Sequence, residues 1–200
     1  FIASKRIFEN IWVQPAANDS GGALGCALYV YYNKMASKRE LGITDQGASL
    51  FGPSFDDNES RHYLEMFGIK YQEFENKKEL DDNIIKYLME EKVVGLFQGR
   101  MEFGPRSLGS RSIIGDPRSE KMQRTMNLRV KYRESFRPFA PAVMKEHASE
   151  YFDIDYHSPY MQFVVPVKKD KRLSVDDTHI EGIDKLYQKR STLPAITHVD

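Results

Sequence analysis

The sequence VVGLFQ at residues 93–98 is followed directly by GRMEFGPRSLGSRS at residues 99–112. The first run is short and apolar, which is typical of a buried strand. The second run, called here the arginine loop, alternates arginines with glycines, a proline and small hydroxyl residues, and this composition predicts a loop. Open α/β sheets bind ligands where loops leave the carboxyl ends of their strands. The order therefore predicts an α/β fold with a binding site on the arginine loop.

The arginine loop contains the residue types that bind anions. An arginine can grip a phosphate or carboxylate with two parallel N–H groups, and glycines let backbone N–H groups approach an anion closely. A basic turn whose arginines pair with surface carboxylates is the alternative, but three arginines held beside an apolar strand favour an anion site. The candidate residues, apart from the acid of the loop, are Arg100, Gly104, Arg106, Gly109, Arg111 and Ser112.

Glu102 is the acidic residue among these arginines. We expect it to act as a charge partner that keeps them oriented. Two direct roles stay open: a contact to Mg²⁺, or a hydrogen bond to a carbamoyl-type NH₂ group.

A second basic run, KYRESFRPFAP, occupies residues 131–141. Its aromatic residues interleave with the cations and lead into an apolar stretch. Basic groups held at the edge of a core in this way can close on a phosphate chain. The charged end of a solvated helix is the alternative. The candidate residues here are Asn127, Lys131, Arg133 and Arg137.

The charge distribution points to a localised anion site. The chain has 29 Lys and Arg against 29 Asp and Glu, so its net charge is zero. Residues 100–137 contain ten of these cations and four of the acids, which gives the segment a charge of +6. A neutral chain with one basic segment favours a particular small anion over nucleic acid or a membrane surface.

Composition places the chain among globular proteins, with 40 % hydrophobic residues in a length of 200. The single cysteine, Cys26, excludes an internal disulfide and suits a reducing compartment. No signal peptide and no apolar run of transmembrane length is visible, so a cytoplasmic location is expected. Because the chain begins with phenylalanine rather than methionine, we expect it to be a piece of a longer protein.

Residue patterns predict alternating helices and strands. The clearest helix covers residues 77–92, where Leu80, Ile84 and Leu88 share one face. A helix over residues 23–35 is apolar all round and needs partners on several sides. Residues 1–48 are therefore expected to be the end of another domain, followed by a domain over residues 49–200, with a linker at 50–54. The remaining expectations are strands over residues 11–13, 70–74, 112–114, 138–144 and 162–167, and helices over residues 56–67, 119–130 (with Ser119 as N-cap) and 145–152.

Asp19 precedes Ser-Gly-Gly at the start of the first expected helix, and a helix cap is its simplest role. It could also ligate a metal or orient a phosphate, but the nearby sequence offers no second ligand. The five histidines are scattered and lack the spacing of a structural zinc site.

These segments resemble the C-terminal region of the O-carbamoyltransferase family typified by nodulation and antibiotic-biosynthesis enzymes, the NodU/CmcH type. The resemblance runs through the arginine loop, residues 113–118, which include Arg118, and residues 127–141 and 193–200. Upstream, QPAANDSGGALG at residues 14–25 resembles the last glycine-rich motif of the N-terminal domain of that family.

The resemblance implies two domains. Residues 49–200 would form a YrdC-like α/β domain, an open twisted sheet with flanking helices, truncated at its C-terminus. Residues 1–48 would be the remnant of an actin/Hsp70-like domain that transfers a carbamoyl group to an acceptor hydroxyl. Within that domain Asp19 would ligate a divalent metal, for which iron is expected, and its histidine ligands would lie upstream of residue 1.

The resemblance also implies a reaction. ATP with Mg²⁺ and carbamoyl phosphate are the expected substrates, carbamoyl-adenylate is the expected product, and neither nucleic acid nor membrane is an expected partner. The two substrates bring about six negative charges that the basic segment can offset. The loop arginines are expected to hold carbamoyl phosphate and the ATP phosphates, while Lys131, Arg133 and Arg137 close on the α-phosphate and Asn127 orients one of these groups. The expected catalytic residues are Arg106, Arg111 and Lys131, and Arg118 is a further expected binding residue.

Two other functions stay open. A stand-alone carbamoyl- or threonylcarbamoyl-adenylate synthase fits the basic runs, but the motif at residues 14–25 argues against it. A non-catalytic module that binds anions or RNA could use Tyr132, Phe136 and Phe139 to stack on bases. Zero net charge and the burial-type spacing of these aromatics disfavour that function. The sequence does not identify the acceptor.

Overall fold

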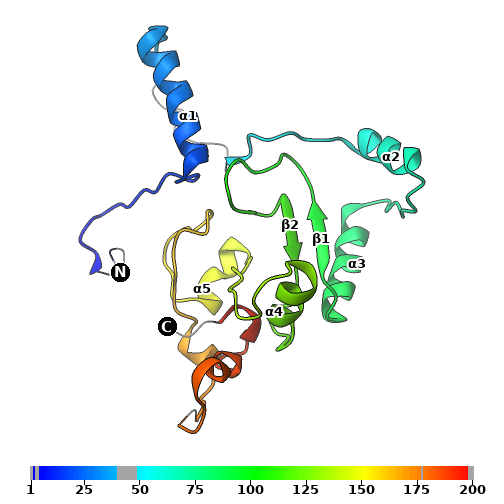
Figure 1. Cartoon of the computed structure of the whole chain (residues 1–200), viewed down its shortest axis with the longest axis vertical. Helices are drawn as coiled ribbons and strands as arrows, with labels where there is room; N and C mark the ends of the chain where they lie inside the picture. The colour runs from blue at the N-terminus through cyan, green and yellow to red at the C-terminus, as the bar shows by residue number, and fades with distance from the viewer. Residues whose placement is uncertain (1, 3–4, 40–48, 177, 198–200) are drawn as a thin grey trace.

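A computed structural model of the chain describes residues 2, 5–39, 49–176 and 178–197 (Figure 1). Its elements are short, and they combine helices with strands as the expected fold class requires. In chain order the helices and strands are α1 (Asp19–Tyr29), α2 (Asp57–Met66), α3 (Lys77–Met89), β1 (Val94–Phe97), β2 (Arg111–Ile114), α4 (Met122–Thr125) and α5 (Ala148–Tyr151). π-Helical turns extend α1 over Val30–Lys34 and α4 over Met126–Val130, and 3₁₀ turns cover Lys145–His147, Lys169–Lys171, Gly182–Tyr187 and Pro194–Ile196.

Strands β1 and β2 form a two-stranded antiparallel sheet. Val94 pairs with Ile114 and Phe97 with Arg111, and the N–H of Gln98 extends the pairing by donating to the carbonyl oxygen of Ser110 at 3.0 Å. Both strands occur where they were predicted, β2 starting one residue early. β1 is not buried as expected: half-buried and exposed residues alternate along it, because only one face of the hairpin packs against the core.

Side-chain caps start α2 and α3 close to their predicted positions. Asp56 accepts the N–H of Glu59 at 2.8 Å, and the Glu59 carboxylate accepts the N–H of Asp56 at 2.9 Å, which is a capping box. Asn76 accepts the N–H of Glu79 at 3.0 Å. The bonds at both helix starts satisfy N–H groups that have no partner inside the helix.

Several predicted elements differ in the structure. Helix α1 starts four residues early and none of its residues is buried. Ser119 is not the N-cap of α4, which begins after Lys121, and its hydroxyl hydrogen-bonds Glu91 instead. Residues 11–13, 70–74, 138–144 and 162–167 form no strands, apart from a single bridge between Val167 and Phe152. A strand needs a neighbouring strand, and the prolines at 138 and 141 remove two N–H donors that pairing would require.

The core lies between α4 and β2. A Cβ at Gly115 would stand 2.7 Å from Cγ of Met122, so glycine permits this close approach. Ile113 follows the arginine loop and Phe139 lies near the end of the second basic run, so both basic segments lead into the same core. The buried residues are Met122, Met126 and Ala195, and Val93, Ile113 and Phe139 pack against them.

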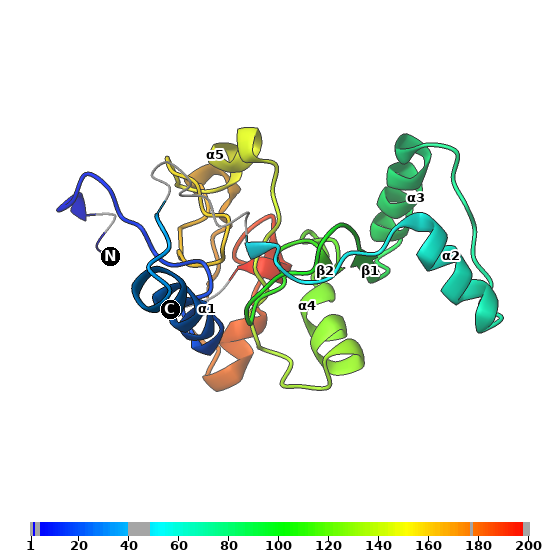
Figure 2. The ribbon, with the colours of Figure 1, turned by 90° about the horizontal axis from the view of Figure 1, so that it is seen from above.

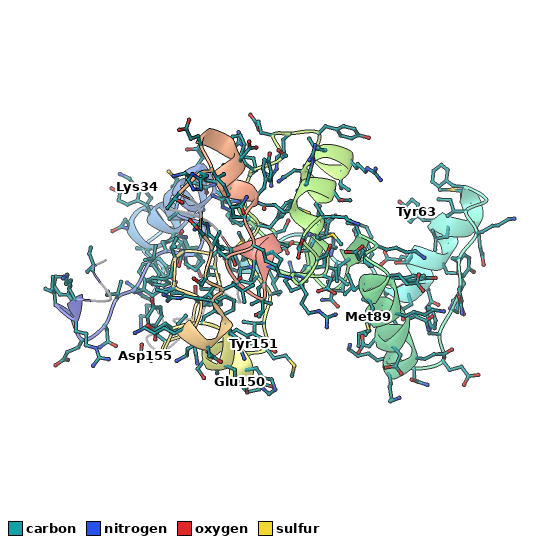
Figure 3. All side chains as sticks on the ribbon, turned by 90° about the horizontal axis from the view of Figure 1, so that it is seen from below. Lys34, Tyr63, Met89, Glu150, Tyr151 and Asp155 are labelled. Atoms are coloured by element: carbon teal, nitrogen blue, oxygen red, sulfur yellow. The ribbon has the colours of Figure 1, made fainter. Side chains whose placement is uncertain are left out.

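Many apolar side chains away from this core are exposed. Trp12 is 73 % exposed and Val164 is 95 % exposed. Helices α2 and α3 lie at one end of the molecule (Figure 2), where Tyr63 and Met89 project with 54 % and 65 % exposure (Figure 3). Among the described residues, no helix combines the length and the apolarity that crossing a membrane requires.

Two expectations fall outside the described residues. One is the domain boundary between residues 48 and 49, since residues 40–48 are not described. The other is the end of the motif at residues 193–200, which the structure describes only to Thr197.

Candidate functional site

The arginine loop is held against residues 49–53, most of which belong to the stretch at 50–54 that the sequence indicated only as a linker. The N–H of Gly52 donates to the carbonyl oxygen of Met101 and the N–H of Met101 donates to that of Pro53, both at 2.9 Å. The N–H of Phe103 donates to the carbonyl oxygen of Ser49 at 2.6 Å. A Cβ at Gly52 would lie 2.7 Å from Cβ of Met101, so only glycine allows this approach.

Two of the three loop arginines bind backbone carbonyl groups of the chain itself. Arg100 donates to the carbonyl oxygens of Phe51 and Gly52, both at 3.1 Å. The guanidinium of Arg111 lies 3.6 Å from the centre of the Phe97 ring, a distance at which a cation is attracted to the ring face. It also donates, at 2.9–3.3 Å, to the carbonyl oxygens of Pro53, Gln98, Gly99 and Ser110. Both guanidinium groups therefore support the shape of the loop.

Arg106 differs from the other two arginines. It is exposed, and it makes no hydrogen bond or ion pair with any residue that the structure describes. Gly104 and Gly109 flank it with φ angles of +132° and +107°, which suit glycine and strain other residues. Ala16 is only 2 % exposed, and its Cβ lies 3.4 Å from where a Cβ at Gly104 would stand. The loop therefore carries one unpaired guanidinium, and its backbone at Gly104 lies beside Ala16, just before the start of α1 (Figure 1).

The carboxylate of Glu102 is buried and binds backbone N–H groups instead of a guanidinium. Its Oε1 accepts from Leu108 and Ser110 at 2.7 Å each and from Arg111 at 3.2 Å, and its Oε2 accepts the same Arg111 N–H at 3.2 Å. Burial raises the pKa of this carboxyl, but the backbone hydrogen bonds outweigh it and the pKa of Glu102 lies below its usual value. Glu102 thus orients the loop through the backbone, where a charge partner for arginine side chains was expected.

Ser112, the remaining polar candidate residue of the loop, also acts locally. Ser112 accepts the N–H of Gly109 at its Oγ, at 3.0 Å. This bond steadies the second glycine turn of the loop just before β2.

Asn127 is fully buried and organises residues 131–141. Its Nδ2 donates to the carbonyl oxygens of Ser135 at 3.0 Å and Arg137 at 2.8 Å. Its Oδ1 accepts from Nε of Arg133 at 2.6 Å, and its own backbone carbonyl accepts the N–H of Arg133 at 3.0 Å. Asn127 is therefore the side chain that orients Arg133.

The cations of residues 131–141 differ in how they are engaged. The guanidinium of Arg133 also lies 5.0 Å from the centre of the Phe139 ring. Arg137 forms an ion pair with Glu134 at 3.1 Å. Lys131 is exposed, and its ammonium group has no partner among the described residues. No hydrogen bond or ion pair between described residues joins this run to the arginine loop.

Arg118 pairs with an acid two residues away. Its Nη2 lies 2.7 Å from Oδ2 of Asp116 and its Nε lies 2.9 Å from Oδ1. The hydrogen bond from Arg118 holds the pKa of Asp116 below its usual value, although burial opposes this shift. The pair closes the turn that leads into α4.

Asp19 is the first residue of α1, and the residue before it is the cap: Asn18 accepts the N–H of Ser20 at 3.0 Å. Asp19 is exposed. No group of three or more His, Cys, Asp or Glu that could hold a metal occurs within the described ranges. By themselves, these residues lack the donor set for the divalent metal that the resemblance implies at Asp19.

Comparison with known proteins matches the region that contains both basic runs. The family described as Carbamoyltransferase C-terminus matches residues 85–200. An uncharacterized protein of Synechocystis sp. is 48 % identical over 197 residues, which cover 96 % of this chain and 32 % of the relative.

Two relatives have names connected with nodulation. Nodulation protein NolNO of Sinorhizobium fredii is 39 % identical over 189 residues, covering 90 % of this chain and 27 % of the relative. Nodulation protein NolO of Bradyrhizobium diazoefficiens is 37 % identical over 199 residues, covering 94 % of this chain and 35 % of the relative. The chain therefore spans about a third of the length of these curated relatives.

Proposed function

Because the chain belongs to the carbamoyltransferase C-terminus family, we propose that it forms part of an enzyme that makes carbamoyl-adenylate from ATP and carbamoyl phosphate. The carbamoyl group would then pass to a hydroxyl group of an acceptor. Residues 49–200 would carry out adenylate formation on a YrdC-like α/β fold. Residues 1–48 would belong to an actin/Hsp70-like transfer domain.

The observation that carries this proposal is the single unpaired guanidinium of Arg106 on a loop whose other arginines are engaged. A free arginine can bind two oxygens of one phosphate group, which suits carbamoyl phosphate. Lys131 supplies a second unpaired cation, which would contact the ATP phosphates as a point charge. Arg133, held in place by Asn127, would face the α-phosphate.

In the proposed reaction, water displaces phosphate from carbamoyl phosphate and leaves carbamate and inorganic phosphate. A carbamate oxygen then bonds to the α-phosphorus of ATP, while the bond from that phosphorus to the pyrophosphate oxygen breaks. Negative charge develops on the phosphate oxygens, so cations held in position at Arg106 and Lys131 would stabilise the transition state. Mg²⁺ would arrive bound to the ATP phosphates, since the described residues hold no three-ligand cluster of their own.

The packing of Ala16 against Gly104 supports the proposal that residues 49–200 form the adenylate and residues 1–48 belong to the part that transfers the carbamoyl group. It places the start of α1 beside the loop that carries Arg106. An activated carbamoyl group formed at the loop would therefore have a short path toward residues that precede α1.

Pyrophosphate release tests the proposal. ATP would be incubated with and without carbamoyl phosphate and Mg²⁺, using residues 1–200 and using the full polypeptide that contains them. We expect release only when carbamoyl phosphate is present. Release by the longer polypeptide alone would assign the reaction to the larger assembly, and no release from either, despite ATP binding, would contradict an enzymatic function.

A nucleic-acid surface is less well supported. Phe139 packs against the core, so its ring is not free to stack on a base. Tyr132 and Phe136 are 86 % and 42 % exposed, so the burial expected for these two aromatics was wrong. RNA binding would also weaken steeply with salt and show no preference for ATP over an oligonucleotide. A titration with both ligands at two salt concentrations separates the two functions.

A further inference from the structure

The tip of the arginine loop has few attachments of its own. In the described part of the chain, residues 104–107 make no hydrogen bond to another backbone group. The nearest anchors are the N–H of Phe103 on one side and the N–H of Leu108, bound to the carboxylate of Glu102, on the other. Arg106 lies between these anchors. The backbone on either side of Arg106 is therefore held by two anchors, one of which is the carboxylate of Glu102.

A carboxylate is suited to this task. When ionised it only accepts hydrogen bonds, and it can take several N–H donors at once. The side chain of Glu102 has its bonds to N–H groups of Leu108, Ser110 and Arg111, and no charged side chain of the described residues hydrogen-bonds it. Because Glu102 is only 7 % exposed, water has little access to its carboxylate and cannot readily replace these bonds.

We propose that Glu102 is a positioning residue of the anion site. Its carboxylate acts as a built-in anion that folds the loop around itself and sets the place from which Arg106 binds a phosphate group. It touches neither Mg²⁺ nor the carbamoyl NH₂, the two direct roles that the sequence left open. The inference takes from the proposed function only the identity of the anion, carbamoyl phosphate.

Four variants of the full polypeptide test this role. Glu102→Gln keeps the size of the side chain but replaces one acceptor oxygen by an NH₂ group that repels the N–H donors. Arg106→Ala removes the displayed cation, and the double variant combines both changes. Glu90→Gln is the matched control, because Glu90 is an exposed glutamate that pairs with Lys92 outside the site.

Two measurements are made on each variant: backbone amide hydrogen exchange at neutral pH, and carbamoyl phosphate affinity by calorimetry. Glu102→Gln should speed exchange at Leu108 and Ser110 by about tenfold or more, while the amides of β1 and β2 keep their rates. It should also weaken carbamoyl phosphate binding to the level of Arg106→Ala. The double variant should bind no worse than Arg106→Ala, because the two residues act through one contact.

Two results would overturn the inference. One is unchanged exchange at Leu108 and Ser110 in Glu102→Gln. The other is a double variant whose affinity loss is the product of the single losses, which would mean that Glu102 contacts the ligand directly. If the unaltered protein bound no carbamoyl phosphate, the proposed function would fail, and the exchange rates would still decide whether Glu102 holds the loop.

Discussion

The carboxylate of Glu102 meets the N–H of Ser110, eight residues further along the chain, at 2.7 Å inside the arginine loop. This bond and its neighbours favour the ionised carboxylate, so the pKa of Glu102 in the folded protein lies below its usual value. A carboxyl whose pKa is lower in the folded protein than in the unfolded chain stabilises the fold fully at pH values above its unfolded pKa. This stabilisation is lost as the pH falls through its pKa in the folded protein.

We therefore expect an acid transition confined to the loop. The amide proton resonances of Leu108 and Ser110 should shift together in an NMR titration, with a midpoint below the ordinary glutamate pKa. Glu102→Gln should abolish this transition. A midpoint at or above the ordinary value would show that the backbone N–H groups do not stabilise the ionised form.

The arginines of the loop should separate into two classes when each is replaced by alanine. Arg106→Ala should abolish pyrophosphate release that depends on carbamoyl phosphate and change Tm by no more than about 2 °C, because Arg106 has no described partner. Arg111→Ala should lower the free energy of unfolding by about 2 kcal/mol, because carbonyl groups lose their donors. Calorimetric melting and a pyrophosphate assay check both, and a large fall in Tm for Arg106→Ala would make that residue structural.

Asn127→Ala should be among the most destabilising polar substitutions in the chain. Asn127 is 0 % exposed and its removal leaves two carbonyl groups and Nε of Arg133 without their partner. We expect a loss of about 2–3 kcal/mol in the free energy of unfolding, measured by urea denaturation. Asn58→Ala, in an exposed position on α2, is the control and should change it by less than about 0.5 kcal/mol.

Gly52→Ala should weaken the contact between residues 49–53 and the loop. The added Cβ would stand 2.7 Å from Cβ of Met101 and 2.9 Å from its carbonyl oxygen, so we expect a cost of about 1–3 kcal/mol. Gly22→Ala is the matched control in α1, where nothing lies within 4 Å of the new Cβ and a gain of about 0.5–1 kcal/mol is expected. Equal effects of the two substitutions on thermal unfolding would contradict the close approach at Gly52.

Lys131 and Arg133, two of the three cations of the second basic run, should affect ATP binding in different ways. Lys131→Ala removes an unpaired ammonium group and should weaken ATP binding without changing Tm. Arg133→Ala should weaken ATP binding more than carbamoyl phosphate binding and should also lower Tm, because the Arg133 side chain bonds Asn127 and lies over Phe139. Calorimetric titration with each ligand checks this, and equal losses for ATP and carbamoyl phosphate would remove the assignment of this run to ATP.

The elements that the sequence predicted well are those whose signals are local. Helices α2 and α3 start directly after Asp56 and Asn76 because these polar side chains cap them, and this chemistry is visible in a few neighbouring residues. The predicted strands at residues 138–144 and 162–167 failed because strand formation depends on a partner elsewhere in the chain, which local pattern does not reveal. The helix at α1 was predicted correctly as a helix, but its burial was not, because exposure depends on what packs against it.

The roles of the site residues likewise depend on partners that local sequence pattern does not reveal. The sequence drew attention to Arg100, Arg106 and Arg111 as equivalent members of one loop. Their separation into one unpaired and two engaged guanidinium groups depends in part on carbonyl groups at residues 51–53. These lie 48 to 58 positions upstream of the arginines that bind them, in a stretch interpreted as a linker. Glu102 accepts hydrogen bonds from backbone N–H groups, and Asn127 donates hydrogen bonds to backbone carbonyl groups. These roles depend on how the chain turns around each side chain, which residue type alone does not specify.

The hydrogen-bonded contact between residues 49–53 and the arginine loop has a mechanical consequence. Arg100 and Arg111 reach across from the hairpin and hold the carbonyl groups of a segment that enters from far upstream. A displacement of residues 49–53 would therefore move the loop with them, because hydrogen bonds join the two segments. Such a displacement would also change the position of Arg106, which lies on the same loop.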